Sequence, residues 1–228
     1  MIPLKDDLPT GRVPVVTIAF AAVNVLAFLW QLSVGMEQSV MRGGAIPYEI
    51  LTFQDVEWRD LVPPPFTILT SMFLHGGFAH VGMNMLMFWI FGNNVEDALG
   101  RLRFVAFYLL AGVAAALTQS VAAVMSGAQY VPMVGASGAI AGVLAGYLVL
   151  FPHARVLTVL IIVFYVRLQY LPATFYIGFW FVLQVLSVVF GGDPSVAVFA
   201  HIGGFVTGFV LVRLVGRRPG WRGRRVSW

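Results

Sequence analysis

Hydrophobic residues form six long runs along the chain, separated by short polar segments. The runs cover residues 13–34, 77–95, 104–125, 136–150, 172–190 and 198–214. Most approach the roughly 20 residues that an α-helix needs to cross about 30 Å of hydrocarbon, and none alternates every second residue as the strands of a membrane β-barrel do. The pattern predicts an all-α, polytopic membrane protein that is a single bundle of six transmembrane helices.

One of the six runs, and one further apolar segment, are shorter than a full span. Residues 136–150 would form a helix only about 22 Å long, so this fourth helix is expected to begin inside the membrane with its amino end submerged. A seventh candidate, residues 156–166, lies between Arg155 and Arg167 and is too short to span. We expect it to be an interfacial or cytoplasmic segment.

Composition and charge place the chain in lipid and orient it. Hydrophobic residues make up 59% of the chain and charged residues 11%, and the mean hydropathy is +0.87. Six spans place both termini on one side, and the positive-inside rule makes that side cytoplasmic. Two basic residues, Arg42 and Arg59, fall on the opposite side. The other twelve fall on the cytoplasmic side: Lys5, Arg12, Arg101, Arg103, Arg155, Arg167, Arg213, Arg217, Arg218, Arg222, Arg224 and Arg225.

The same basic residues argue against a nucleic-acid partner. The net charge is +4, but the arginines flank hydrophobic runs, where they act as topology signals. The tail 215–228 is expected to be a basic cytoplasmic extension. The opposite loop, residues 35–76, mixes acidic and aromatic side chains and suits a structure in the headgroup region. The chain has no cysteine, which excludes thiolate metal sites, and we expect no metal and no cofactor.

Polar side chains inside predicted spans are candidates for function, because they are costly at membrane depth. The second helix carries His80 and Asn84, the fourth begins near Ser137, and the sixth carries His201. Counting at 1.5 Å per residue from the cytoplasmic ends places all four at roughly 18–24 Å, on one level. Each alone is also typical of helix packing. Because all four are placed at one depth, a shared functional site is favoured.

The chemistry of these four residues is that of a serine hydrolase. Ser137 would lie at a submerged helix amino end, where backbone N–H groups without intrahelical partners suit a developing oxyanion. His80 and Asn84, spaced i and i+4, share a helix face and could add donors. His201 is the candidate base. No Asp or Glu lies in the middle of a span, so we predict a dyad. Glycine ridges on the fourth and sixth helices would permit close approach of the two helices.

Several motifs resemble those of the rhomboid family of intramembrane proteases. The segment from Gly135 to Gly138 reads Gly-Ala-Ser-Gly and is similar to the family's Gly-x-Ser-Gly nucleophile motif. The remaining likeness lies in His75, His80 and Asn84 of the second helix, Ala200, His201, Gly204 and Gly208 of the last, and the pair Trp58 and Arg59 in the first outer loop.

The resemblance implies roles for these residues. Ser137 and His201 would be the catalytic dyad, and His80, Asn84 and the backbone N–H of Ser137 would form the oxyanion hole. His75 would have a structural role. The fifth helix, with the loop 191–197, would be a candidate gate for substrate.

One position departs from the family pattern. Some members have a tyrosine four residues after the serine, packed on the histidine, where this chain has Ala141. Another side chain, Tyr147 or Phe205, would then have to hold His201.

The resemblance implies an enzyme that cleaves transmembrane segments of other membrane proteins near the outer face of the membrane. Its partners would be transmembrane substrates and the lipid bilayer, and its place the cell membrane of a prokaryote. A non-catalytic rhomboid-like binder or quality-control factor is the alternative, but it would have no need of Ser137 and His201. A small transporter or channel is a third class, and the lack of intramembrane carboxylates and of obvious repeats speaks against it.

Overall fold

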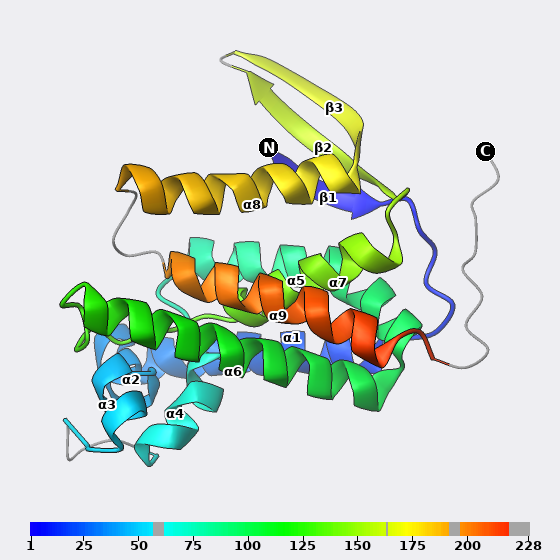
Figure 1. Ribbon diagram of the computed structural model, residues 1–228. Coiled ribbons are helices and arrows are strands. Elements are labelled where there is room, and N and C mark those ends of the chain that lie inside the picture. The colour runs from blue at the N-terminus through cyan, green and yellow to red at the C-terminus, as the bar shows by residue number, and fades with distance from the viewer. Residues whose placement is uncertain (57–61, 163, 192–196, 219–228) are drawn as a thin grey trace.

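The computed structural model describes residues 1–56, 62–162, 164–191 and 197–218, and most of them are helical (Figure 1). Each of the six predicted runs forms a helix. These helices are α1 (Val15–Val34), α5 (Phe78–Leu99), α6 (Arg101–Met125), α7 (Ser137–Leu150), α8 (Ala173–Phe190) and α9 (Val198–Val215). Within the described ranges, α1, α6, α8 and α9 are long and apolar enough to cross a membrane. The chain is therefore a polytopic helical membrane protein.

The other two helices fall short of that criterion for different reasons. α5 has 22 residues, but its polar side chains lower its mean hydropathy. α7 is apolar but has only 14 residues, about 21 Å at 1.5 Å per residue. The number of spans and the submerged start of α7 stay predictions.

The expectation of an all-α protein is wrong in one region. Most of the seventh apolar run belongs to strand β2 (Arg155–Ile162), which pairs antiparallel with β3 (Tyr165–Pro172). The amino-terminal segment adds β1 (Ile2–Asp6) beside β2, in the order β1-β2-β3. A short run rich in β-branched residues suits a strand. One of its partners, β3, is the adjacent segment, whereas β1 lies about 150 residues away and cannot be read from local pattern.

The predicted outer loop contains three short helices. They are α2 (Met36–Gly43), α3 (Pro47–Thr52) and α4 (Pro64–Ser71). Figure 1 shows them together at one end of the bundle, with the sheet toward the other end. Trp58 and Arg59 lie outside the described residues.

α7 is the central helix of the bundle. Every residue from Gly138 to Tyr147 is buried, as is Leu150, and α7 packs against α5, α6 and α9. A helix that is apolar on all sides suits such a place. α8 is the opposite case. It buries only Ala173, Tyr176 and Ile177 and lies at the margin of the bundle, next to the projecting hairpin β2–β3 (Figure 1).

Glycines bring α7 and α9 into backbone contact. A Cβ at Gly204 would collide with the backbone carbonyl of Gly138, and one at Gly208 with that of Gly142. Small residues of this kind let two membrane helices approach closely. The close approach places the first turn of α7 beside the first turns of α9.

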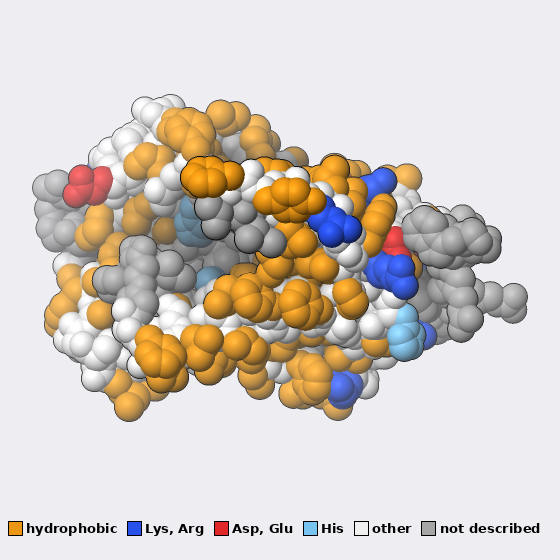
Figure 2. Space-filling model, turned by 90° about the horizontal axis from the view of Figure 1, so that it is seen from above, with side chains coloured by type: hydrophobic (Ala, Val, Ile, Leu, Met, Phe, Trp, Pro, Cys, Tyr) orange, Lys and Arg blue, Asp and Glu red, His pale blue; other side chains and the backbone are white. Residues whose placement is uncertain are grey.

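The C-terminal end of α5 binds segments near both ends of the described chain. The buried Glu96 carboxylate accepts hydrogen bonds from the backbone N–H groups of Val16 and Thr17, at 3.0 and 2.7 Å, and so caps α1 from a distant helix. Asp97 accepts from the backbone of Gly11 and pairs with Arg218 at 3.2 Å. Basic side chains gather toward this end of the molecule in Figure 2, and hydrophobic side chains are spread over much of the face shown.

A carboxyl group joins the sheet to this end of the bundle. Asp6 accepts hydrogen bonds from the hydroxyl of Tyr147 at 2.7 Å and the amide of Asn94 at 2.6 Å. Burial raises the pKa of Asp6 from 3.8 to about 6, against the opposing effect of the Tyr147 hydrogen bond and with a further increase from Asp7. The charged form is therefore less favoured in the folded protein than in the unfolded chain.

This pKa predicts a pH-dependent stability. The stabilisation from Asp6 is complete below pH 3.8 and is lost as the pH rises through about 6, because the folded state holds its proton more tightly. Asp6→Asn should remove this part of the pH dependence and raise the thermal midpoint in detergent at neutral pH. Asp55→Asn, at an exposed site, is the control and should leave the profile unchanged. A lower midpoint for Asp6→Asn at every pH would show that the carboxylate's hydrogen bonds outweigh its burial.

Candidate active site

Ser137 and His201 meet where α7 and α9 begin. The hydroxyl oxygen Oγ of Ser137 lies 2.8 Å from Nε2 of His201. Ser137 is the first residue of α7, and the His201 side chain is buried in the first turns of α9. The separation is that of a hydrogen bond between a nucleophile and its base.

The second ring nitrogen of His201 is held by α8. Nδ1 of His201 lies 2.7 Å from the amide oxygen Oε1 of Gln184. An amide oxygen only accepts hydrogen bonds, so Nδ1 carries the proton and Nε2 is free to accept from the serine hydroxyl. The ring of Trp180, one turn earlier on α8, also contacts the imidazole, with 5.6 Å between ring centroids.

The sequence did not predict the contacts of Gln184 and Trp180 with His201. The side chains expected to hold His201 have other partners: Tyr147 donates to Asp6, and Phe205 stacks on Phe181 with 4.2 Å between ring centroids. A signal was available, because Gln184 is a polar side chain within an apolar span and such residues are functional candidates.

Two side-chain donors of α5 converge on Gly135, two residues before the serine. Nδ1 of His80 accepts from the backbone N–H of Gly76 at 3.3 Å, so its proton lies on Nε2. A Cβ at Gly135 would lie 2.7 Å from that Nε2 and 3.7 Å from Nδ2 of Asn84. Gly135 has φ of +125°, a conformation that side chains other than glycine rarely adopt.

The amide nitrogen Nδ2 of Asn84 lacks a partner within the described part of the chain. This nitrogen is buried and donates no hydrogen bond there. Buried donors are normally paired, and an unpaired one calls for an explanation such as a catalytic role. The first backbone N–H groups of α7, which begins at Ser137, have no intrahelical acceptors. The arrangement can stabilise negative charge beside Ser137.

His75 supports the start of α5. It is fully buried, and its ring packs edge-on against that of His80 with 5.1 Å between centroids. Its backbone N–H and carbonyl are both bound by the amide of Gln31, at 2.8 and 3.1 Å. The amide of Gln31 thereby holds the turn that leads to Gly76, whose N–H binds the ring of His80, and a structural role for the His75 side chain stays a prediction.

A small cavity of about 40 Å³ adjoins the serine. Ser137 lines it together with Met72, Gly112, Ala115 and Ala139. Its lining of mostly small residues suits a small side chain of a substrate. As to metals, the ranges that the structure describes contain no cluster of three His, Asp or Glu side chains.

The chain matches known proteins over most of its length. A model of the Rhomboid domain family matches residues 63–218. The chain is 38% identical over 100 residues to rhomboid protein 1, mitochondrial, of Saccharomyces cerevisiae, a match covering 43% of this chain and 29% of that protein. It is 29% identical over 186 residues to RHOMBOID-like protein 6, mitochondrial, of Arabidopsis thaliana, covering 81% and 52%.

A mouse protein gives a similar match. The presenilin-associated rhomboid-like protein, mitochondrial, of Mus musculus is 38% identical over 97 residues, covering 42% of this chain and 26% of that protein. The chain thus spans between about a quarter and a half of the length of these three relatives.

The names of these relatives correct the predicted location. The sequence analysis placed the chain in the cell membrane of a prokaryote, whereas the yeast, mouse and Arabidopsis proteins are all named as mitochondrial. Helix length and the distribution of arginines identify a bilayer and its basic side, but they do not distinguish one membrane of this kind from another.

The matched region, residues 63–218, contains Ser137, His201, His80 and Asn84 together with five of the six predicted spans. Relatives from fungi, animals and plants bear the same family name. This chain belongs to the rhomboid family.

Proposed function

We propose that this protein is an intramembrane serine endopeptidase that cleaves transmembrane segments of other membrane proteins with Ser137 and His201 as its catalytic dyad. The observation that carries the proposal is the 2.8 Å contact between Ser137 Oγ and His201 Nε2 beside the unpaired donor of Asn84. A protein that only binds membrane segments would need neither the aligned pair nor the donors.

The first half of the reaction forms an acyl-enzyme. Nε2 of His201 takes the proton of the Ser137 hydroxyl as Oγ attacks the scissile carbonyl carbon. The carbonyl oxygen becomes an oxyanion, which His80 Nε2–H, Asn84 Nδ2–H and the backbone N–H of Ser137 stabilise. The tetrahedral intermediate collapses, the C–N bond breaks, and the imidazolium gives its proton to the leaving amine.

The second half releases the enzyme. Water loses a proton to His201 and attacks the ester carbonyl, and a second oxyanion forms in the same place. Its collapse breaks the ester bond and returns the proton to Ser137 Oγ, which leaves a free carboxyl on the product. One peptide bond and one water are consumed, and the enzyme is regenerated.

The short α7 helix suggests how substrates arrive. At about 21 Å it covers less than the thickness of the hydrocarbon, so Ser137 lies below the membrane surface. A substrate helix would come from the lipid and unwind locally, because an intact helix holds its carbonyls in internal hydrogen bonds. The names of the relatives favour a mitochondrial membrane as the place of this activity.

The dyad is tested by replacing each member. Ser137→Ala and His201→Ala should each abolish cleavage of a labelled single-span substrate by the detergent-purified protein, because nucleophile and base act as a unit. Fluorophosphonate labelling at residue 137 should disappear in Ser137→Ala. Ser120→Ala, a buried serine on α6 that bonds its own helix backbone, should retain full activity. Comparable turnover in either dyad variant would refute the assignment.

The oxyanion donors should have smaller effects. His80→Ala and Asn84→Ala should each lower kcat by about 10–1000-fold while KM changes little, because they share stabilisation of a charge that exists only in the transition state with backbone donors. Asn93→Ala, near the other end of α5, is the matched control. If both variants kept the wild-type kcat, the pair would belong to helix packing alone.

The cavity predicts specificity for a small residue before the scissile bond. Met72→Ala enlarges the cavity and should raise the ratio of kcat/KM for a leucine substrate to that for an alanine substrate by roughly 10-fold or more. Both substrates are measured on the same protein sample. A loss of folded protein therefore lowers both kcat/KM values equally and leaves their ratio unchanged. An unchanged ratio would show that the substrate side chain does not enter this cavity.

A further inference from the structure

The two ends of α8 are held very differently. The buried residues Ala173, Tyr176 and Ile177 lie in its first turn and a half, next to the hairpin. Toward the other end, Val185, Leu186, Val189 and Phe190 are exposed. Figure 1 shows α8 at the edge of the bundle along its whole length. The far end of α8 is therefore the part of this helix that can most easily leave the bundle.

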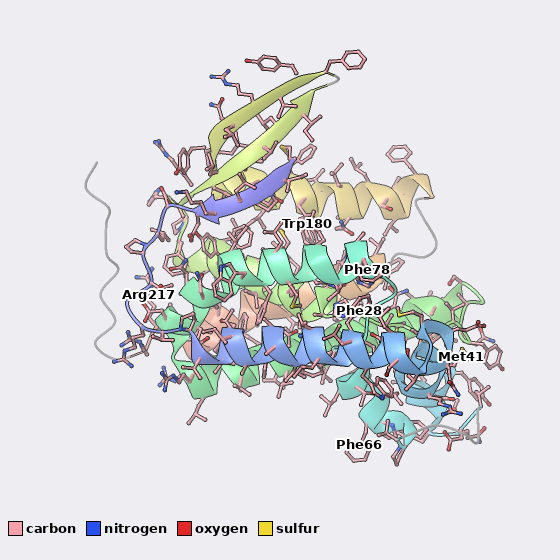
Figure 3. The ribbon with its side chains drawn as sticks, turned by 180° about the vertical axis from the view of Figure 1, so that it is seen from behind. Phe28, Met41, Phe66, Phe78, Trp180 and Arg217 are labelled. Atoms are coloured by element: carbon pink, nitrogen blue, oxygen red, sulfur yellow. The ribbon has the colours of Figure 1, made fainter. Side chains whose placement is uncertain are left out.

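Three side chains in the middle of α8 connect it to α9. Trp180 and Gln184 contact His201, and Phe181 stacks on Phe205. Tyr176, Trp180 and Gln184 are spaced by four residues and thus share one helix face. In Figure 3, Trp180 lies between α8 and the rest of the bundle. Two of the three connections end on the same imidazole ring, that of His201.

We propose that Gln184 is the positioning residue of His201 and that it makes the base competent only while α8 lies against α9. The inference rests on the proposed function and goes beyond it. The 2.7 Å contact between Gln184 Oε1 and His201 Nδ1 fixes the proton on Nδ1 and the lone pair on Nε2, which faces Ser137. Among the described residues, the partner of Nδ1 is a neutral amide from a different helix and not a carboxylate.

This arrangement couples substrate access to activation of the base. A substrate that reaches Ser137 from the lipid past α8 displaces its far half and separates Gln184 from His201. The imidazole then loses the acceptor that sets its tautomer and orientation. Return of α8 restores the hydrogen bond, so the serine is activated only while α8 lies against α9. The same movement that admits water and substrate thus leaves the nucleophile unactivated.

The first arm of the test removes the acceptor. Gln184→Leu should lower kcat for a single-span substrate by about 10–100-fold with KM within about twofold, and fluorophosphonate labelling of Ser137 should slow by the same factor. Gln184→Glu keeps an acceptor at the same distance and should restore most of the loss. Leu183→Ala, on the exposed side of α8, is the control and should match the wild type.

The second arm tests the coupling with a double-mutant cycle. Phe181→Ala removes the ring stack that holds α8 on α9, and it should slow phosphonate labelling when Gln184 is present. In the Gln184→Leu background it should have little further effect, because the hydrogen bond through which α8 sets the His201 tautomer is already absent. The phosphonate is small, so its reaction does not require a helix to be admitted. Phe181→Leu, which removes the stack but keeps an apolar side chain, serves if Phe181→Ala does not fold.

The outcomes separate the two proposals. Absence of labelling at Ser137 in the wild-type protein refutes the proposed function itself. Labelling of the wild type with an unchanged kcat in Gln184→Leu refutes the positioning role of Gln184. Equal slowing by Phe181→Ala in both backgrounds refutes the coupling through Gln184. The whole inference is supported if Phe181→Ala slows phosphonate labelling only when Gln184 is present and if Gln184→Glu restores most of the activity.

Discussion

The backbone contact between α7 and α9 is the constraint on which the rest of the site depends. Gly204 and Gly208 let α9 lie directly on the carbonyl groups of Gly138 and Gly142, and no larger residue fits at either position. Ser137 precedes the first of these contacts by one residue, and His201 precedes Gly204 by less than one turn. The 2.8 Å separation of their reactive atoms therefore follows from helix packing rather than from loop conformation.

The centre of the bundle is tightly packed, whereas its margin is loosely packed. α7 is buried over nearly its whole length, which fixes Ser137 and the backbone N–H groups around it. α8 is largely exposed, which in the proposed function suits a helix that lets a substrate helix pass. Gln184 and Trp180 connect the two regions, because they bring the loosely packed α8 into contact with His201. The proposed function needs both fixed donors and a helix that can be displaced, and a uniformly packed bundle would not supply both.

The opposite end of the bundle is held by polar contacts. Glu96 caps α1 and Asp97 binds the segment after α9, so one short stretch of α5 joins both ends of the described chain. Asp6 ties the sheet to α5 and α7 through Asn94 and Tyr147. These contacts lie near the basic end, where water and headgroups can solvate charge that the hydrocarbon would not tolerate. The hairpin from which α8 departs is thereby anchored while the far end of α8 is not.

The sequence by itself determined the helices and the small set of polar residues that form the site, because hydrophobic run length and rare intramembrane polar side chains are local signals. His80, Asn84, Ser137 and His201 were all identified from residue type and estimated depth. Only the tertiary structure decided what depends on pairs distant in the chain. The predicted interfacial segment pairs with its neighbour β3 and, on its other edge, with β1, about 150 residues away, and the distant pairing could not be read from the sequence. Gln184 touches His201 only because α8 packs across α9, and nothing in the spacing of the two residues reveals which face of α8 meets the bundle.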